Sequence, residues 1–230
     1  MSLLTVKNVS YSFQDGEALR YILQDITTEF ERGKFYAILG ESGSGKTTFL
    51  SLLSALDKPQ TGEILFEGQN ISKMGLEKYR RNHIGIIFQA YNLIPFMTAV
   101  ENVQVAMSIT DNNMTGSQEE VALNLLDFIG ITKDMAKRTV NQLSGGQQQR
   151  VAIARALSTN VDLILADEPT GNLNEEMETE IVAILKKLAH EHNKCVVVVT
   201  HSTEIAKRAD VTLKLKKGRI ANLDEEAETA

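Results

Sequence analysis

The stretch KFYAILGESGSGKTTFLSLLSAL, residues 34–56, decides how this chain folds. It opens with a short apolar run that alternates too little for a half-exposed strand, and from residue 46 onward it follows a helical pattern. Gly40, Gly43 and Gly45 lie between the two, where a loop must adopt backbone angles that a Cβ would obstruct. Strand, tight loop and helix in this order predict an α/β fold.

The loop also matches the pattern G-x-x-x-x-G-K-[ST]. Inward-turned N–H groups and a helix N-terminus together bind phosphate, so we predict a phosphate-binding loop at residues 40–48, hereafter the phosphate loop. Lys46 is expected on the β- and γ-phosphates of a nucleotide, and the Thr47 hydroxyl on Mg²⁺. The alternative is a flexible glycine loop, which the strand–loop–helix context disfavours. The predicted nucleotide-binding residues here are Gly40, Ser42, Gly43, Ser44, Gly45, Lys46, Thr47 and Thr48.

Outward from the phosphate loop, the sequence predicts a mostly parallel sheet with helices between its strands. Three more apolar runs share the character of residues 34–39, namely HIGIIF (83–88), VDLILA (161–166) and KCVVVVT (194–200). Helical patterns are found at 117–129, with a capping box from Ser117 to Glu120, and at 175–190. The first thirty residues alternate on either side of QDGEA, which predicts an N-terminal antiparallel β ribbon.

No strand pattern interrupts the long segment between the runs at 83–88 and 161–166. We therefore predict one domain over residues 1–230, with a core of about 1–89 and 161–230 and an inserted helical lobe of about 90–160. The acidic tail NLDEEAETA, residues 222–230, is expected to be a frayed terminus.

Composition and charge argue against several classes of protein. The formal net charge of −6 argues against a nucleic-acid partner, since such binding relies on clustered Lys and Arg. The longest apolar runs are too short to span a membrane, and the N-terminus lacks the pattern of a secretory leader. A single cysteine, Cys195, excludes an internal disulfide framework. We expect a cytoplasmic chain whose membrane role, if it has one, depends on a partner.

A pair of carboxylates follows the buried run LILA, in LILADEP at residues 163–169. Parallel strands end at one rim, so Asp167 is expected to hold Mg²⁺ near the phosphate loop and Glu168 to reach the water that attacks the γ-phosphate. The alternative is two solvated turn charges before Pro169. Gln89 and His201 follow two other strands at the same rim, although each alone is most simply a loop residue.

In their order and spacing, these motifs resemble the nucleotide-binding subunit of an ATP-binding cassette (ABC) transporter. The motifs are GESGSGKT, Gln89, LSGGQ at 143–147, LILADE and His201. The segments at 88–103 and 141–157 most resemble the group that serves lipoprotein release, macrolide and antimicrobial-peptide efflux, and cell division. The resemblance implies an ATPase that uses ATP and Mg²⁺, with Lys46, Gln89, Glu168 and His201 as catalytic residues and with Thr47, Gln89 and Asp167 around the metal.

The LSGGQ stretch, hereafter the signature segment, implies a homodimer. In that family two subunits pair head to tail, so Ser144, Gly145, Gly146 and Gln147 of one chain are expected to close over ATP held by the phosphate loop of the other. This sandwich is an isologous two-fold arrangement. The alternative is a glycine-rich start to an ordinary helix.

Two positions depart from the family pattern or leave it ambiguous. Asn174 stands in GNLN where the family usually has aspartate, which puts in doubt any contact between subunits that needs a charge there. For the aromatic residue that stacks on adenine, YSF offers both Tyr11 and Phe13, and motif spacing favours Phe13.

The resemblance also implies a transmembrane permease partner, placing the chain at the cytoplasmic face of the cell membrane in export or extraction of a peptide, lipoprotein or drug-like substrate. The apolar segment from Gln89 to Met97, hereafter the docking segment, is the candidate contact, the alternative being that it only fills the core of the lobe. Three other classes of protein fit less well: an ABC-type protein acting on ribosomes or DNA, a phosphoryl-transfer kinase, and an inactive binding module, which would lack Glu168.

Overall fold

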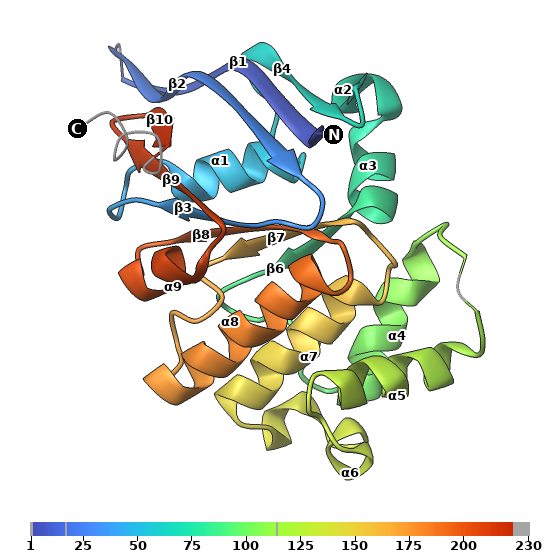
Figure 1. Cartoon of the computed structure of the whole chain (residues 1–230). Coiled ribbons are helices and arrows are strands. Elements are labelled where there is room, and N and C mark those ends of the chain that lie inside the picture. Colours follow the sequence, from blue (N-terminus) through green and yellow to red (C-terminus); the bar gives the residue numbers. More distant parts are fainter. Residues whose placement is uncertain (1, 17, 114, 223–230) are drawn as a thin grey trace.

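The computed structural model describes residues 2–16, 18–113 and 115–222. Within them the strands form two sheets, ordered β2-β1-β4-β5 and β10-β9-β3-β8-β7-β6 (Figure 1). The strands are β1 (Ser2–Asp15), β2 (Ala18–Glu31), β3 (Phe35–Leu39), β4 (Thr61–Phe66), β5 (Gln69–Asn70), β6 (Ile84–Ile87), β7 (Leu163–Asp167), β8 (Cys195–Thr200), β9 (Val211–Lys216) and β10 (Arg219–Asn222). The acidic tail at 223–230 lies outside the described residues.

The larger sheet confirms the predicted parallel core. Strands β3, β8, β7 and β6 pair in parallel, and β9 adds a further parallel strand beside β3. Only the edge strand β10, among the described residues, runs antiparallel, against β9. The four predicted apolar runs coincide with β3, β6, β7 and β8 to within two residues. Their near-complete burial explains why the runs do not alternate.

The smaller sheet contains the predicted N-terminal ribbon. Strands β1 and β2 pair antiparallel, and the register places Phe13 opposite Arg20. Strand β4, which the sequence reading did not identify, pairs with the other edge of β1. The ribbon is therefore part of a wider antiparallel sheet, which covers the helix that follows the phosphate loop (Figure 1).

The helices connect and cover the two sheets. They are α1 (Lys46–Leu53), α2 (Ile71–Met74), α3 (Leu76–His83), α4 (Ala99–Ile109), α5 (Gln118–Phe128), α6 (Lys133–Ala136), the 3₁₀ helix η1 (Val140–Gln142), α7 (Gly145–Leu157), α8 (Glu175–His190) and α9 (Thr203–Arg208). Helix α8 matches its prediction, and α5 begins after Ser117, whose hydroxyl accepts from the Glu120 N–H at 3.2 Å.

Helix α1 ends earlier than its apolar pattern predicts, at Leu53 rather than at residue 56. The physical reason lies at Ala55, whose backbone has a φ of 55°. A left-handed residue cannot continue a right-handed helix, so the turn there ends α1 although Leu56 is apolar.

Two buried clusters hold the layers together. One joins the outer sheet, α1 and one face of the central sheet, and the other joins the opposite face of that sheet to α4, α5, α7 and α8. Between β6 and β7 the described residues contribute helices but no strand of either sheet. Helix α7 approaches β6 so closely that a Cβ at Gly85 would lie 2.6 Å from the Ala156 carbonyl oxygen. Glycine is therefore required at that contact.

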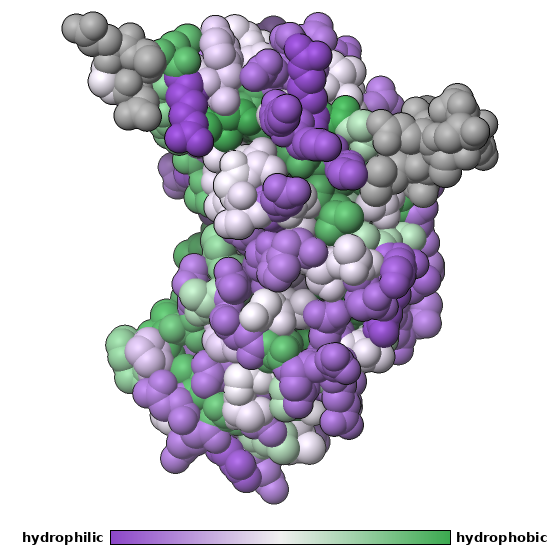
Figure 2. All heavy atoms as spheres, turned by 90° about the vertical axis from the view of Figure 1, so that its left-hand side faces the viewer, coloured by the Kyte–Doolittle hydropathy of each residue, from purple (hydrophilic) through white to green (hydrophobic). Residues whose placement is uncertain are grey.

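The parallel strands place their carboxyl ends at one edge of the central sheet, which is where α/β folds build ligand sites. The phosphate loop follows β3, Glu168 follows β7, and His201 follows β8. The face of the molecule shown in Figure 2, on the side of this edge, is mostly hydrophilic, with hydrophobic side chains scattered over it. In the described part of the chain no helix combines the length and the apolar character that a membrane span requires.

Candidate active site

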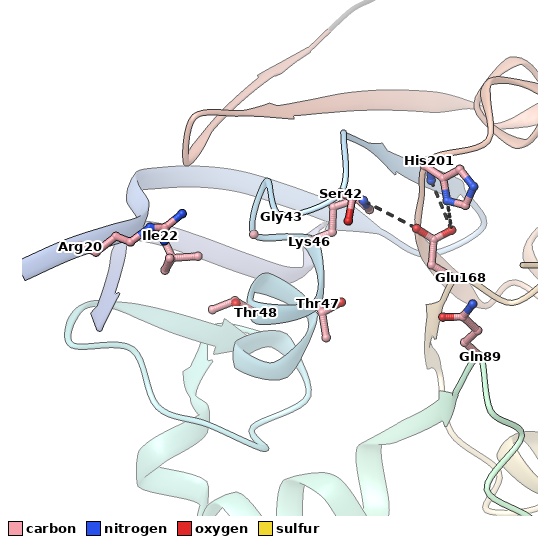
Figure 3. A pocket seen from close by; sticks show the side chains of 11 residues that line it. Arg20, Ile22, Ser42, Gly43, Lys46, Thr47, Thr48, Gln89, Glu168 and His201 are labelled. Atoms are coloured by element: carbon pink, nitrogen blue, oxygen red, sulfur yellow. Dashed lines mark hydrogen bonds and ion pairs between the residues drawn. The ribbon is translucent and has the colours of Figure 1, made fainter. Parts of the chain in front are cut away.

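An open pocket of about 700 Å³ lies at the carboxyl edge of the central sheet. The predicted residues that line it are Ser42, Gly43, Gly45, Lys46, Thr47, Thr48, Gln89, Glu168 and His201. Figure 3 shows the phosphate loop in the middle, Gln89, Glu168 and His201 at one end, and Arg20 and Ile22 at the other. The sequence reading missed Arg20 and Ile22, because they come from β2 and reach the pocket only through the pairing of the sheet.

The phosphate loop has the backbone that its glycines predict. Gly43 and Gly45 have φ values of 77° and 102°, in the left-handed region that favours glycine. A Cβ on Gly40 would lie 2.5 Å from the Ser44 hydroxyl oxygen and 2.8 Å from the Leu215 carbonyl oxygen. The Ser44 hydroxyl itself is buried and has no hydrogen-bond partner among the described residues. The loop therefore holds a polar group that a phosphate oxygen can satisfy.

Lys46 lies folded across its own loop. Its side chain is 8% exposed, and Nζ donates to the carbonyl oxygens of Gly40 at 2.8 Å and Glu41 at 3.1 Å. Nζ also lies 3.6 Å from Oε1 of Glu168. These contacts keep a nearly buried cation paired, and phosphate oxygens, which carry more negative charge, compete with carbonyls for it.

Asp167 ends β7 and faces the start of α1. Its Oδ1 accepts from the Thr47 hydroxyl at 3.5 Å. Burial raises the pKa of Asp167, and the nearby charge of Glu168 raises it further, whereas the Thr47 hydrogen bond opposes both effects. A carboxylate that is costly to keep charged gains from a cation placed beside it.

These residues fit a magnesium ion. Magnesium prefers oxygen ligands and is usually held by one or two carboxylates, water and the phosphates of its substrate. The described residues contain no group of three or more His, Cys, Asp and Glu side chains that forms a metal cage. Thr47 and Asp167 supply one hydroxyl and one carboxylate beside the phosphate loop, and the Gln89 amide lines the same pocket. This donor set suits a metal that arrives with a nucleotide.

Glu168 is held in one orientation by the residues that follow β8. Its Oε2 accepts from the Thr200 hydroxyl at 3.1 Å and from the His201 N–H at 3.3 Å, and it lies 3.0 Å from His201 Nδ1. The Glu168 side chain is 14% exposed, whereas that of His201 is 67% exposed. Glu168 also has a φ of 43°, in the left-handed region that residues with a side chain adopt less often than glycine. Its carboxylate is therefore fixed at the wall of the pocket.

Gln89 lies in the turn after β6 and begins a segment that connects the pocket to α7. A Cβ on Gly171 would lie 2.9 Å from Nε2 of Gln89, so the Gln89 side chain packs against Gly171 too closely for a larger residue at position 171. Further along the same segment, Arg155 of α7 donates to the carbonyl oxygen of Tyr91 at 2.8 Å and to that of Asn92. The docking segment thus joins the pocket to the helix of the signature segment.

The structure separates the two candidates for adenine stacking. Tyr11 is only 8% exposed, and its hydroxyl donates to Asp57. Phe13 is 50% exposed, with its ring edge-on to that of Tyr11 at a centroid distance of 5.1 Å. A ring that is fixed and covered has no free face for a base, so the geometry favours Phe13.

The signature segment lies apart from this pocket. Among the described residues, none of Ser144, Gly145, Gly146 and Gln147 lines it. Ser144, Gly146 and Gln147 line a separate cavity of about 230 Å³, together with Met177 and others. Within one chain the phosphate loop and the signature segment are therefore not brought together.

Asn174 has a structural role at the start of α8. Its Oδ1 accepts from the Met177 N–H at 2.9 Å, which caps the helix. Aspartate forms the same cap, so the departure from the family pattern leaves the fold unchanged and alters only the charge.

Comparisons with known proteins cover almost the whole chain and point to one family. Residues 23–171 match a family described as ABC transporter. An uncharacterized ABC transporter ATP-binding protein of Bacillus subtilis, YclH, is 48% identical over 95% of each chain. A dimeric structure of MJ0796, an ABC transporter cassette, is similar with a TM-score of 0.86 at 40% identity, covering 94% of this chain and 96% of that one. MJ0796 comes from Methanocaldococcus jannaschii and has also been solved in a post-hydrolysis state bound to ADP and Pi.

A further relative is a longer protein. The macrolide export ATP-binding/permease protein MacB 2 of Aeromonas hydrophila is 39% identical over 95% of this chain, which covers 34% of that protein. The match therefore concerns one part of a protein whose name includes both an ATP-binding part and a permease.

Proposed function

Because this chain belongs to the ABC transporter family and is the ATPase subunit of a transporter, we propose that it pairs with a second copy on MgATP and drives a separate permease. The observation that carries this proposal is the arrangement of one pocket. The phosphate loop, Gln89, Glu168 and His201 all line it, and Lys46 and Glu168 lie 3.6 Å apart.

The residues of this pocket suit hydrolysis by in-line attack of water on the γ-phosphate. Phosphoryl transfer requires positioning and charge neutralisation more than covalent chemistry. Lys46 neutralises phosphate charge, while Glu168, fixed by Thr200 and His201, orients the water and draws its proton. A magnesium ion held by Thr47, Asp167 and Gln89 supplies further charge stabilisation when it is bound.

The second copy supplies what this pocket lacks. Its signature segment is proposed to close over ATP, with Ser144, Gly145, Gly146 and Gln147 facing the γ-phosphate. The separation of the two helix starts within one chain supports this arrangement, as does the dimeric structure of the MJ0796 cassette. The division into a core of about 1–89 and 161–230 and a helical lobe of about 90–160 fits the same picture, since the signature segment belongs to the lobe.

The permease is proposed to bind at the docking segment, at the cytoplasmic face of the membrane. Phe96 is 77% exposed, which is unusual for a large apolar side chain and suits a partner. Leu93 instead packs partly against the buried cluster of the lobe, so the segment has both a core side and a free side. Similarity to a macrolide export protein supports export or extraction of a peptide, lipoprotein or drug-like substrate.

The test is Glu168→Gln, which keeps the shape of the side chain and removes its basicity. We expect ATP binding to persist and hydrolysis to fall by roughly two or more orders of magnitude, as when a positioned general base is removed. An ATP-bound dimer should then accumulate on gel filtration. Glu204→Gln, an exposed carboxylate on α9, is the control and should hydrolyse ATP normally. Near wild-type hydrolysis by Glu168→Gln would refute the assigned base.

A further inference from the structure

The pocket extends beyond the residues that act on the terminal phosphates. Arg20 and Ile22, both on β2, line its far end, while Gln89, Glu168 and His201 line the other end. The phosphate loop lies between these two groups (Figure 3). A nucleotide whose γ-phosphate faces Glu168 therefore extends its ribose and base towards β2.

The pairing of the ribbon places Arg20 beside the aromatic ring proposed for the base. Phe13 and Arg20 are direct cross-strand partners in the antiparallel pair of β1 and β2. Residues directly opposite each other project to the same face of a sheet, and residues two apart along a strand share a face. Phe13 and Arg20 thus share one face, while Leu19, next to Arg20 and opposite Gln14, projects to the other.

Arg20 is an available cation. It is exposed and forms no hydrogen bond or ion pair with any residue in the described part of the chain. An adjoining cavity of about 490 Å³ is lined by Arg20 and also by Lys214, Lys216 and Lys217, with Glu41 as the carboxylate that faces them. The surroundings of Arg20 are therefore positive on balance and favour an anionic or oxygen-rich ligand.

We propose that Arg20 binds the nucleoside end of ATP, donating to ribose oxygens and the α-phosphate while Phe13 stacks on the base. A guanidinium carries several donors in a fixed plane and stays charged at all relevant pH values, which suits a phosphate and a neighbouring hydroxyl together. The proposal rests on the proposed function, because it assumes that ATP occupies this pocket with Phe13 under its base.

The test compares nucleotide affinities of the whole chain by isothermal titration. Arg20→Ala should weaken ATP and ADP by the same factor, roughly 3- to 10-fold, since a partly exposed charge-assisted hydrogen bond is lost that does not involve the γ-phosphate. Arg20→Lys should recover part of the loss, because it keeps the charge and loses the planar geometry. Leu19→Ala, on the other face of the same strand, is the matched control and should leave both affinities unchanged.

Three outcomes overturn the proposal. The first is that Arg20→Ala binds both nucleotides like the wild type, the second is a loss of affinity for ATP alone, and the third is a loss of affinity for both nucleotides no larger than that of Leu19→Ala. Failure of the proposed function looks different: wild-type chain would not bind ATP, or Lys46→Ala would bind it as well as wild type. Arg20→Ala with normal affinity beside a defective Lys46→Ala therefore refutes the role of Arg20 alone.

Discussion

Two helices of this chain begin at glycine-rich segments suited to anions, and their first turns are built differently. Helix α1 begins at Lys46 with Gly45 as its N-cap and with no side chain bonded to its first turn. Helix α7 begins with a complete capping box, in which the Ser144 hydroxyl accepts from the Gln147 N–H at 3.3 Å and Gln147 Oε1 accepts from the Ser144 N–H at 2.9 Å. One start is open and the other is closed by its own side chains.

The difference fits the proposal that the two starts, one from each chain of a pair, share one ligand. The open turn of α1 offers its N–H groups and Lys46 to several phosphate oxygens. At α7 the capping box uses the N–H groups of Ser144 and Gln147, which leaves those of Gly145 and Gly146 and the hydroxyl proton of Ser144. Such a start is rigid and makes only a few contacts. It suits a lid for the γ-phosphate rather than an independent binding site.

The strongest test of this comparison is Gly146→Asp, which puts a carboxylate where a partner's γ-phosphate is proposed to lie. We expect dimerisation on ATP to be lost and turnover to fall by roughly a thousand-fold, since like charges in a closed interface cost several kcal/mol. Affinity of the monomer for ATP should be nearly intact. Steady-state hydrolysis, gel filtration and nucleotide titration measure the three quantities.

Gly146 also packs against its own chain, which requires a control. A Cβ there would lie 2.8 Å from Met177 Sδ, in an unbranched and flexible side chain. Gly146→Ala introduces this crowding without the charge and should keep most of the turnover. If Gly146→Ala is as defective as Gly146→Asp, packing rather than phosphate recognition explains the loss.

Mixing variants distinguishes a signature that serves the partner from one that serves its own chain. A dimer of one Gly146→Asp chain and one Lys46→Ala chain, both carrying Glu168→Gln, has one intact composite site if the signature acts on the partner. If it acts on its own chain, both sites are defective. Trapping of one ATP per mixed dimer supports the proposed sandwich, and complete absence of trapping in a mixed dimer shown to form contradicts it.

A second test concerns the segment that links the two helix starts. Phe96→Asp should weaken co-purification with the permease by roughly a hundred-fold or more, because burying an unpaired carboxylate in an apolar groove costs several kcal/mol. ATP binding by the isolated subunit should persist, since Phe96 is 77% exposed in the single chain. Phe96→Leu is the matched control and should retain the permease.

Two results would count against the docking segment. Unfolding of isolated Phe96→Asp, seen as a lost thermal transition, would mean that Phe96 serves the core of the lobe. Normal folding with normal permease binding would mean that the permease contacts another surface.

The sequence predicts those parts of the fold that depend on local pattern. The apolar runs of β3, β6, β7 and β8 and the glycines of the phosphate loop are visible without knowing their neighbours, and the structure confirms the mostly parallel α/β fold. The partial alternation of VTLKLK in β9 is also a local signal of a strand.

The missed features depend on contacts between distant segments. Arg20 reaches the pocket only because β2 pairs with β1 in a particular register, and no local pattern of β2 reveals that register. The packing of Met177 against Gly146 joins the starts of two helices that are separate in sequence. Such contacts follow from the assembled core rather than from the periodicity of either segment.

The smallest predicted effect concerns the stability that the fold loses by burying the Asp167 carboxylate beside the start of α1. Burial raises the pKa of Asp167, so its ionised form is less favourable in the folded chain than in the unfolded one. Between the two pKa values the folded state binds more protons at this carboxyl than the unfolded state does. The free energy of unfolding therefore falls as the pH rises from the unfolded pKa near 4 through the folded pKa. At neutral pH the penalty is fully present. Asp167→Asn removes the charge and still accepts from Thr47, so we expect the Tm of the nucleotide-free chain to rise by about 1 to 3 °C at pH 7.

The same substitution should weaken magnesium-dependent ATP hydrolysis, because a neutral amide is a poorer ligand for a hard cation. The control is pH itself. Well below pH 4 the wild-type carboxyl is largely protonated in both states, so the difference in Tm between Asp167→Asn and wild type should shrink as the pH is lowered. Differential scanning calorimetry at pH 7 and at the lowest pH that keeps the chain folded measures both values. If Asp167→Asn is less stable than wild type at pH 7, the Asp167 carboxylate stabilises the nucleotide-free fold and the predicted penalty for its burial is wrong.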